Sequence, residues 1–91
     1  MNEGQRKQLT NIKGVLEQLK GLIESAKDEI ETMHTDEESK LENMPEGMQQ
    51  GEKGDKMQEG IDALGETFDL LETIDTDMQE AIDKIEEATN A

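Results

Sequence analysis

The sequence has no cysteine, tryptophan or tyrosine, and it has one phenylalanine, one proline and one histidine. The lack of cysteine excludes disulfides and thiolate chemistry, and it agrees with a reducing cytoplasm. With so few aromatic side chains, a chain of 91 residues buries little apolar area. One histidine without cysteine or tyrosine leaves few groups for acid–base or nucleophilic catalysis, so we expect no enzyme and no cofactor.

Long apolar runs and an excess of positive charge are also missing. No stretch approaches the ~20 apolar residues that a membrane span needs, and the polar start is unlike a signal peptide. The formal charge is −15, from 24 acidic and 9 basic residues. This charge disfavours direct binding to nucleic acid or to an anionic membrane. We expect a protein partner with a basic surface; a charge that only keeps the protein in solution is the simpler alternative.

A heptad repeat dominates the first half of the chain. Four heptads begin with an apolar residue and three have another at the fifth place: Ile12, Leu19, Ala26 and Met33, then Leu16, Ile23 and Ile30. Lys13, Lys20, Lys27 and His34 lie on one flank of this stripe, and four glutamates lie on the other. Two apolar places per heptad are typical of a helix that packs along another helix. We expect a helix over residues 5–43 with its seam from Leu9 to Met33, widened towards a bundle by Val15 and Leu22.

A second helix is expected over residues 54–89, with Asp55 as its N-cap. Its seam has the same spacing of three and four, interrupted by Asp75: Met57, Ile61, Leu64, Phe68, Leu71, Met78, Ile82 and Ile85. The Pro/Gly-rich connector, residues 44–53, contains Pro45, which suits the first turn of a short helix. The sequence predicts a single all-α domain over residues 1–91, an antiparallel two-helix coiled-coil hairpin. The wide stripes favour a dimer of hairpins forming a four-helix bundle, with a lone hairpin as the alternative.

An acidic ribbon follows the second helix opposite its seam, because residues 57–91 hold 11 acids and one base. The candidate partner-binding residues are spaced three or four apart for most of their length: Glu59, Asp62, Glu66, Asp69, Glu80 and Asp83. Successive carboxylates lie about 5 Å apart along a helix axis. A DNA strand has a phosphate about every 3.4 Å, so the ribbon imitates a phosphate row loosely. A solvated helix surface is the alternative.

Two short motifs have some features of metal sites. Glu31 and His34 have the Glu-x-x-His spacing of di-iron bundles, but His34 takes the place of a lysine on the outer flank of the repeat. Asp75-Thr-Asp77 alternates acids as a calcium loop does, but the central glycine and the closing glutamate are missing. We therefore expect no metal site.

Residues 43–49 and 54–64 read Asn-Met-Pro-Glu-Gly-Met-Gln and Gly-Asp-Lys-Met-Gln-Glu-Gly-Ile-Asp-Ala-Leu. They resemble a family of small acidic proteins encoded by bacteriophages and prophages, which have Asn-hydrophobe-Pro-Glu-Ser/Gly-hydrophobe-Gln and Met/Leu-Glu-Glu-Ala-Ile-Asp-hydrophobe-Leu. The chain departs from that pattern in having Lys53-Gly54 where an Arg-Gly pair is usual. The resemblance implies a helical phage protein in the host cytoplasm, and small acidic phage proteins of this kind often inhibit host defence or replication enzymes.

These features predict a non-catalytic phage protein that binds and inhibits a host nucleic-acid-handling or defence protein, of restriction or CRISPR type. The contact would be the acidic helical surface acting as a DNA mimic. The alternative is a structural or assembly adaptor that binds through Val15, Leu22 and a methionine-rich tip formed by Met44, Met48 and Met57. Salt separates the two, because acidic steering weakens with ionic strength and apolar contact does not.

Overall fold

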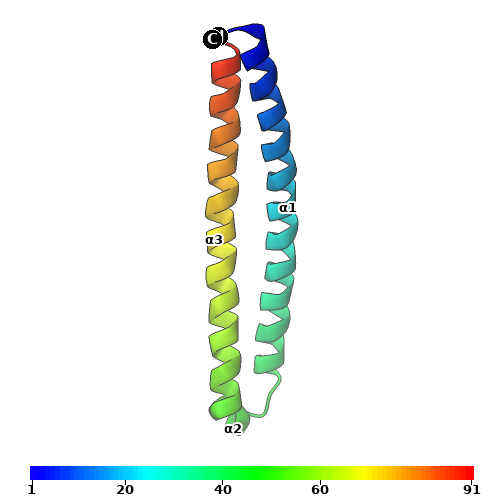
Figure 1. Ribbon diagram of the computed structural model, residues 1–91. Coiled ribbons are helices and arrows are strands. Elements are labelled where there is room, and N and C mark those ends of the chain that lie inside the picture. Colours follow the sequence, from blue (N-terminus) through cyan, green and yellow to red (C-terminus); the bar gives the residue numbers. More distant parts are fainter.

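In the computed structural model, which describes residues 1–91, two long helices lie antiparallel and form a rod (Figure 1). Helix α1 spans Glu3–Glu42, the short α2 spans Glu46–Gln49, and α3 spans Glu52–Thr89. The Cα atoms extend over 68 × 14 × 14 Å. The prediction of an all-α fold is confirmed, since the chain forms helices and no strand.

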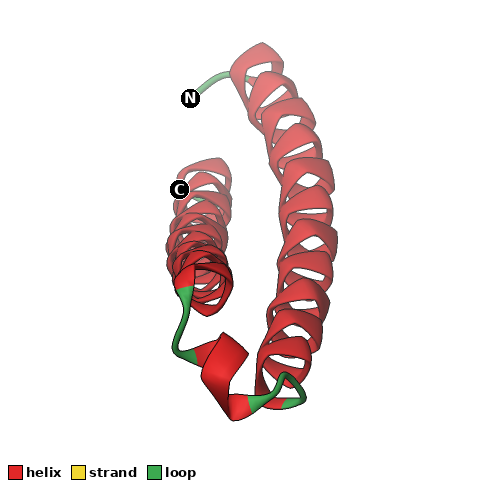
Figure 2. Cartoon of the chain, turned by 90° about the horizontal axis from the view of Figure 1, so that it is seen from below, coloured by secondary structure: helices red, strands yellow, loops and turns green.

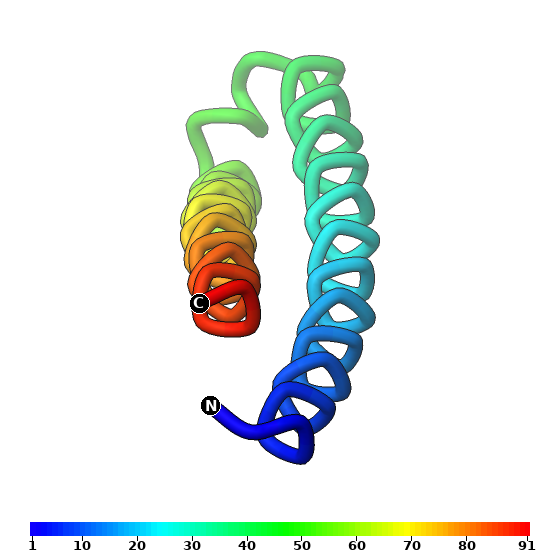
Figure 3. The backbone as a smooth tube through the Cα atoms, turned by 90° about the horizontal axis from the view of Figure 1, so that it is seen from above, coloured from blue at the N-terminus to red at the C-terminus, as the bar shows by residue number.

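The short helix α2 connects the long helices at one end of the rod, and both chain ends lie at the other (Figure 2 and Figure 3). Pro45 is the N-cap of α2, one position before the predicted first turn, and its carbonyl accepts hydrogen bonds from the amides of Met48 and Gln49. The Gln49 side chain donates to the carbonyls of Glu42 and Met44, at 3.1 and 2.9 Å. These bonds satisfy carbonyls that the end of α1 leaves free. The connector is therefore folded, and it spans residues 43–51 rather than 44–53.

Capping explains where the long helices begin. The Asn2 side chain accepts from the Gln5 amide at 2.8 Å, and the Gln5 side chain accepts from the Asn2 amide at 3.1 Å. This capping box starts α1 two residues before the predicted residue 5. Helix α3 starts at Glu52, after an extended Gly51, so the prediction of Asp55 as N-cap is wrong. Asp55 lies instead in the first turn, where its carboxylate is favourable to the helix dipole.

Gly54 allows α3 to begin close against α2. It is buried, and a Cβ atom built on it would overlap the carbonyl oxygen of Gln49. The backbone of Gly54 is not in the left-handed region, so the requirement is for space. The tight end of the hairpin therefore depends on a glycine at this position.

The long helices meet along a seam with a spacing of three and four residues. Every apolar seam residue predicted for α3 is buried or half-buried, and so is Asp75. Only Ile61 and Ile82 are fully buried among apolar residues, each 4% exposed. Two helices cover one side of each other, so the apolar core is one layer deep.

The seam of α1 differs from the predicted one. Three predicted members lie outside it, because Ile12, Leu19 and Met33 are 48%, 44% and 46% exposed. The residues that alternate with Leu9, Leu16, Ile23 and Ile30 at the half-buried positions are Lys13, Lys20, Lys27 and His34. The apolar stripe of α1 is wider than one partner helix covers, and α3 contacts its lysine-bearing edge. Long lysine stems pack against apolar side chains while their ammonium groups reach acidic partners, which makes this edge usable as a seam.

Candidate interaction surfaces

A carboxylate in the middle of the seam holds the two helices in register. Asp75 of α3 lies 3.3 Å from the Lys20 ammonium and 3.5 Å from the Lys27 ammonium. The Lys27 ammonium also lies 5.5 Å from the centre of the Phe68 ring, within range of a cation–π contact. Hydrogen bonds with Glu24 and then Asp75 raise the pKa of Lys20. A charged residue at one seam position specifies which residues pair, as in coiled coils.

A third seam lysine fixes the relative level of the two helices. Lys13 forms ion pairs with Glu86 across the seam and with Glu17 in its own helix, and the hydrogen bond with Glu86 raises the pKa of Lys13. His34, farther along α1, lies beside Gly65. The cross-seam pairs have numbers that add to between 95 and 102: 13 with 86, 20 and 27 with 75, and 34 with 65. At a given height along the rod, the number of the α1 residue and the number of the α3 residue therefore add to about 99.

The position of the seam leaves one side of the rod apolar. We name this surface the apolar face, formed by Ile12, Val15, Leu19, Leu22, Ala26 and Met33 of α1 with Ala63, Thr67, Leu70, Ile74, Ala81 and Ala88 of α3. Residues of both helices share this side because the members on each helix repeat every three, four or seven residues, and because Ile12 and Ala88 line one shallow groove. Its most exposed members are Leu22 and Leu70, at 67% and 66%.

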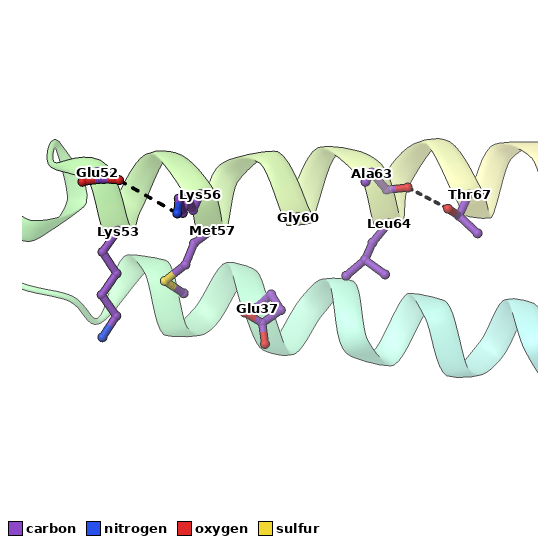
Figure 4. A pocket seen from close by; sticks show the side chains of 9 residues that line it. All are labelled: Glu37, Glu52, Lys53, Lys56, Met57, Gly60, Ala63, Leu64 and Thr67. Carbon is purple, nitrogen blue, oxygen red and sulfur yellow. Dashed lines mark hydrogen bonds and ion pairs between the residues drawn. The ribbon is translucent and has the colours of Figure 1, made fainter.

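Small side chains deepen the apolar face near the connector. Figure 4 shows Met57 and Leu64 directed from α3 towards α1, with Gly60 between them. Glu37 of α1 lines the same groove, and Ala63 extends it along α3. The hollow is a continuation of the apolar face.

The opposite side of the rod is acidic, as the contacts of Lys13 with Glu17 and Glu86 show. We name it the acidic face, formed by Glu17, Glu24, Glu31 and Glu38 of α1 with Glu59, Asp62, Glu66, Asp69, Glu72, Glu80, Asp83, Glu86 and Glu87 of α3. The six carboxylates singled out from the sequence all lie here, all are exposed, and none is within 4.0 Å of a basic group. Asp62 and Asp83 accept hydrogen bonds from glutamine side chains at 2.9 and 3.0 Å.

The basic residues of the long helices lie mostly away from the acidic face. Three of the nine lie in the seam as Lys13, Lys20 and Lys27. The side of the rod that bears the apolar face and its groove has four more bases and five acids, namely Lys40, Lys53, Lys56 and Lys84 with Glu29, Asp36, Glu37, Glu52 and Asp77. That side therefore has a net charge of −1 in a chain of −15, and the remaining surface has −14.

The short motifs with features of metal sites lie in ordinary helical positions. His34 lies in the seam rather than on the predicted outer flank, and its Nδ1 is 3.0 Å from a carboxylate oxygen of Glu38 instead of Glu31. Asp75 and Asp77 lie inside α3. No group of three or more histidine, cysteine, aspartate or glutamate residues is arranged to hold a metal ion. No helix combines the length and the apolarity that a membrane crossing requires.

The seam lysines are the residues that sequence reasoning misplaced. Their signal was present, because Lys13, Lys20 and Lys27 alternate with Leu16 and Ile23 at the spacing of a seam. The single acidic interruption in the partner seam, now seen between Lys20 and Lys27, was the complementary signal. When each of two predicted seams contains a charged residue of opposite sign, the two residues are expected to pair with each other across the seam.

The chain matches no known protein family, no curated protein and no solved structure. Its function is therefore inferred from the geometry and charge of the two faces.

Proposed function

We propose that the chain is a non-catalytic phage protein that binds and inhibits a host nucleic-acid-handling or defence protein through its acidic face. The observation that carries the proposal is the separation of charge around the rod. The six candidate carboxylates from Glu59 to Asp83 have no basic group within 4.0 Å, whereas the acidic-face partners of Lys13, Lys20 and Lys84 are other members, namely Glu17, Glu86, Glu24 and Glu87. A basic cleft in another protein supplies the missing positive charge, and the field of the rod speeds the encounter.

The dimensions of the acidic face support imitation of nucleic acid. Its candidate carboxylates run from Glu59 to Asp83, a rise of about 36 Å along a helix axis. This length is about one turn of duplex DNA. Glutamates of α1 add a second acidic row beside the first. A narrow rod with two rows of carboxylates suits a groove that normally holds a phosphate backbone, and we propose the host cytoplasm as the place where the protein meets such a groove.

We also propose that two hairpins associate as a homodimer in a four-helix bundle. Seven large apolar side chains of the apolar face are between 44% and 67% exposed. Contiguous exposed apolar surface of this kind marks an interaction site. A second hairpin covers what two helices leave open.

A structural or assembly adaptor is the second candidate function, and the same exposed apolar face favours it. An adaptor would bind an apolar partner helix through residues such as Val15 and Leu22. The tip offers one exposed methionine, Met48 at 45%, while Met44 and Met57 are half-buried. Binding of this kind would persist at high salt, whereas binding through the acidic face would not.

Charge reversal distinguishes these functions. In one variant Asp62, Glu66 and Asp69 become lysine, and in a matched control Glu29, Asp36 and Asp77 become lysine. Both variants change the formal charge from −15 to −9, but the control changes the opposite side of the rod.

The assay immobilises the protein and measures capture of a host protein from bacterial lysate, competition by duplex DNA, and release by salt. Loss of capture in the first variant, with helicity intact by circular dichroism, is the expected result. The control should still capture as a single hairpin, because its added lysines weaken self-association but leave the acidic face unchanged. Capture that survives the first variant and ~1 M salt would refute the acidic contact and leave the adaptor.

A further inference from the structure

The apolar face has a stepped pattern of large and small side chains. At four levels of the rod one helix contributes a large side chain and the other a smaller one: Ile12 with Ala88, Leu19 with Ala81, Ile74 with Ala26, and Met33 with Thr67. The numbers in each pair add to 100, which lies within the range of 95 to 102 for the pairs that cross the seam. The large member comes from α1 at three levels and from α3 at one. The face is therefore a series of knobs and hollows with a defined order.

We infer that a second copy of this chain covers this face, related to the first by a two-fold axis along the rod. Such an axis places α1 of one copy over α3 of the other at the same level. Each large side chain then meets a small one, as Leu19 meets Ala81 of the second copy. An isologous interface requires a surface complementary to itself, and large-to-small packing of facing layers provides it.

An axis across the rod fits less well. It would reverse the second copy end for end and place α1 over α1. Ile12 would then meet Met33, which is large against large, and Ala88 would meet Thr67, which is small against small. Leu19 would meet Ala26 and Ile74 would meet Ala81, so two of the four levels would be complementary instead of all four. The order of side chains therefore favours hairpins whose connectors lie at the same end.

Area and charge also favour a second copy as the occupant. A rod of 68 by 14 Å presents a side of about 950 Å², against the ≈ 800 Å² per partner of a standard stable interface. The side in question has a net charge of only −1, so two copies approach without the strong repulsion that the acidic faces would create. The two acidic faces then point in opposite directions, which makes the dimer bivalent for a basic partner.

This inference rests on the self-association proposed above and assigns it a surface. Sedimentation equilibrium tests it with the intact chain. Leu22 and Leu70 are two-thirds exposed in the hairpin, so Leu22→Lys with Leu70→Lys spares the seam. Gln18→Lys with Thr73→Lys is the matched control, because it adds the same two charges to exposed positions of the same helices away from the face.

The wild type is expected at about twice its mass of 10.2 kDa. The leucine variant should raise the dimer dissociation constant about 100-fold or more, since ammonium groups are costly to bury. The control should leave the constant unchanged. A wild type that stays at 10.2 kDa up to millimolar concentration, or a leucine variant that dimerises as tightly as the wild type, would overturn the assignment.

A second variant distinguishes loss of the dimer from loss of the folded hairpin. Ala81→Leu leaves helix propensity high and adds bulk at an exposed position, so it should weaken the dimer without loss of helicity. The axis is tested by mixing Leu19→Cys and Ala81→Cys proteins with a short bismaleimide, which works cleanly because the chain has no cysteine. Cross-links between unlike chains are expected, and their absence in a mixture that dimerises would overturn the axis along the rod.

The experiments distinguish failure of the dimer proposal from failure of the acidic contact. The Asp62, Glu66 and Asp69 reversal should still dimerise, and the leucine variant should still capture the basic partner with lower avidity.

Discussion

Truncation of single side chains should separate the seam from the apolar face. Ile61 is 4% exposed and Leu22 is 67% exposed, although both are aliphatic residues of long helices. Removing a buried isoleucine costs about 2–5 kcal/mol. The seam is one layer deep, so the gap left by Ile61→Ala opens to solvent and the cost falls at the low end, about 2–3 kcal/mol. Against a total stability of roughly 5–14 kcal/mol for 91 residues, this is a large fraction.

The loss of stability in Ile61→Ala should also lower the melting temperature. At about 4–8 °C per kcal/mol for a small domain, Ile61→Ala should lower the melting temperature by roughly 10–20 °C. Leu22→Ala should cost about 0.5 kcal/mol or less in the isolated hairpin, because little of the side chain leaves water and alanine favours the helix. Ile82→Ala, at the other end of the seam, should behave like Ile61→Ala, since Ile82 is also 4% exposed.

Urea unfolding followed by circular dichroism at several protein concentrations is the assay. The cost of Ile61→Ala should persist in dilute protein, because it belongs to the hairpin. The cost of Leu22→Ala should grow with protein concentration, because it belongs to the dimer. Equal costs for the two variants in dilute protein would refute the assignment of the seam.

Three further predictions follow from the helix contacts. Gly14→Ala should stabilise the hairpin by up to about 1 kcal/mol, because an added Cβ meets nothing within 4 Å. Gly54→Ala should destabilise the hairpin, because the added Cβ collides with α2. Thermal melts in which Gly54→Ala is the more stable variant would contradict both predictions. The hydrogen bond with Glu24 raises the pKa of Lys20 above its ordinary 10.5, so its contribution to stability is full below pH 10.5 and is lost as the pH rises through the raised pKa. The melting temperature should therefore fall as the pH rises above about 10.5, and a constant value would contradict the ion pairs. Asp75→Lys should place three ammonium groups together, and their mutual repulsion should destabilise the hairpin. Helicity at 25 °C that matches the wild type would exclude the seam network.

The sequence was sufficient for the helical class, the seam of α3 and the outward acidic carboxylates. It was insufficient for the seam of α1, because the stripe that includes Ile12 and Leu19 is too wide for one partner helix to cover. Which edge is used depends on the other helix, and Asp75 selects the lysine edge by pairing with Lys20 and Lys27. Periodicity along one helix contains no information on that choice.

The first residue of each long helix was predictable from the sequence in one case and not in the other. The Asn2–Gln5 capping box was readable from the sequence, since both residue types are typical of that motif. The start of α3 was not, because Asp55 is a good cap by residue type and the cap position went to Gly51. Close packing of Gly54 against α2 sets that start, and it depends on contacts between two elements.

Alkylation of cysteine at three consecutive positions tests the two-faced rod most directly. Leu22 lies on the apolar face, Ile23 in the seam and Glu24 on the acidic face, and the cysteine-free chain allows each to be replaced alone. In dilute protein, cysteine at 23 should react slowly and cysteine at 22 and 24 rapidly. In concentrated protein, position 22 should become protected while position 24 stays reactive. Protection of position 22 equal to that of position 23 in dilute protein, or protection of position 24 on concentration, would contradict the account.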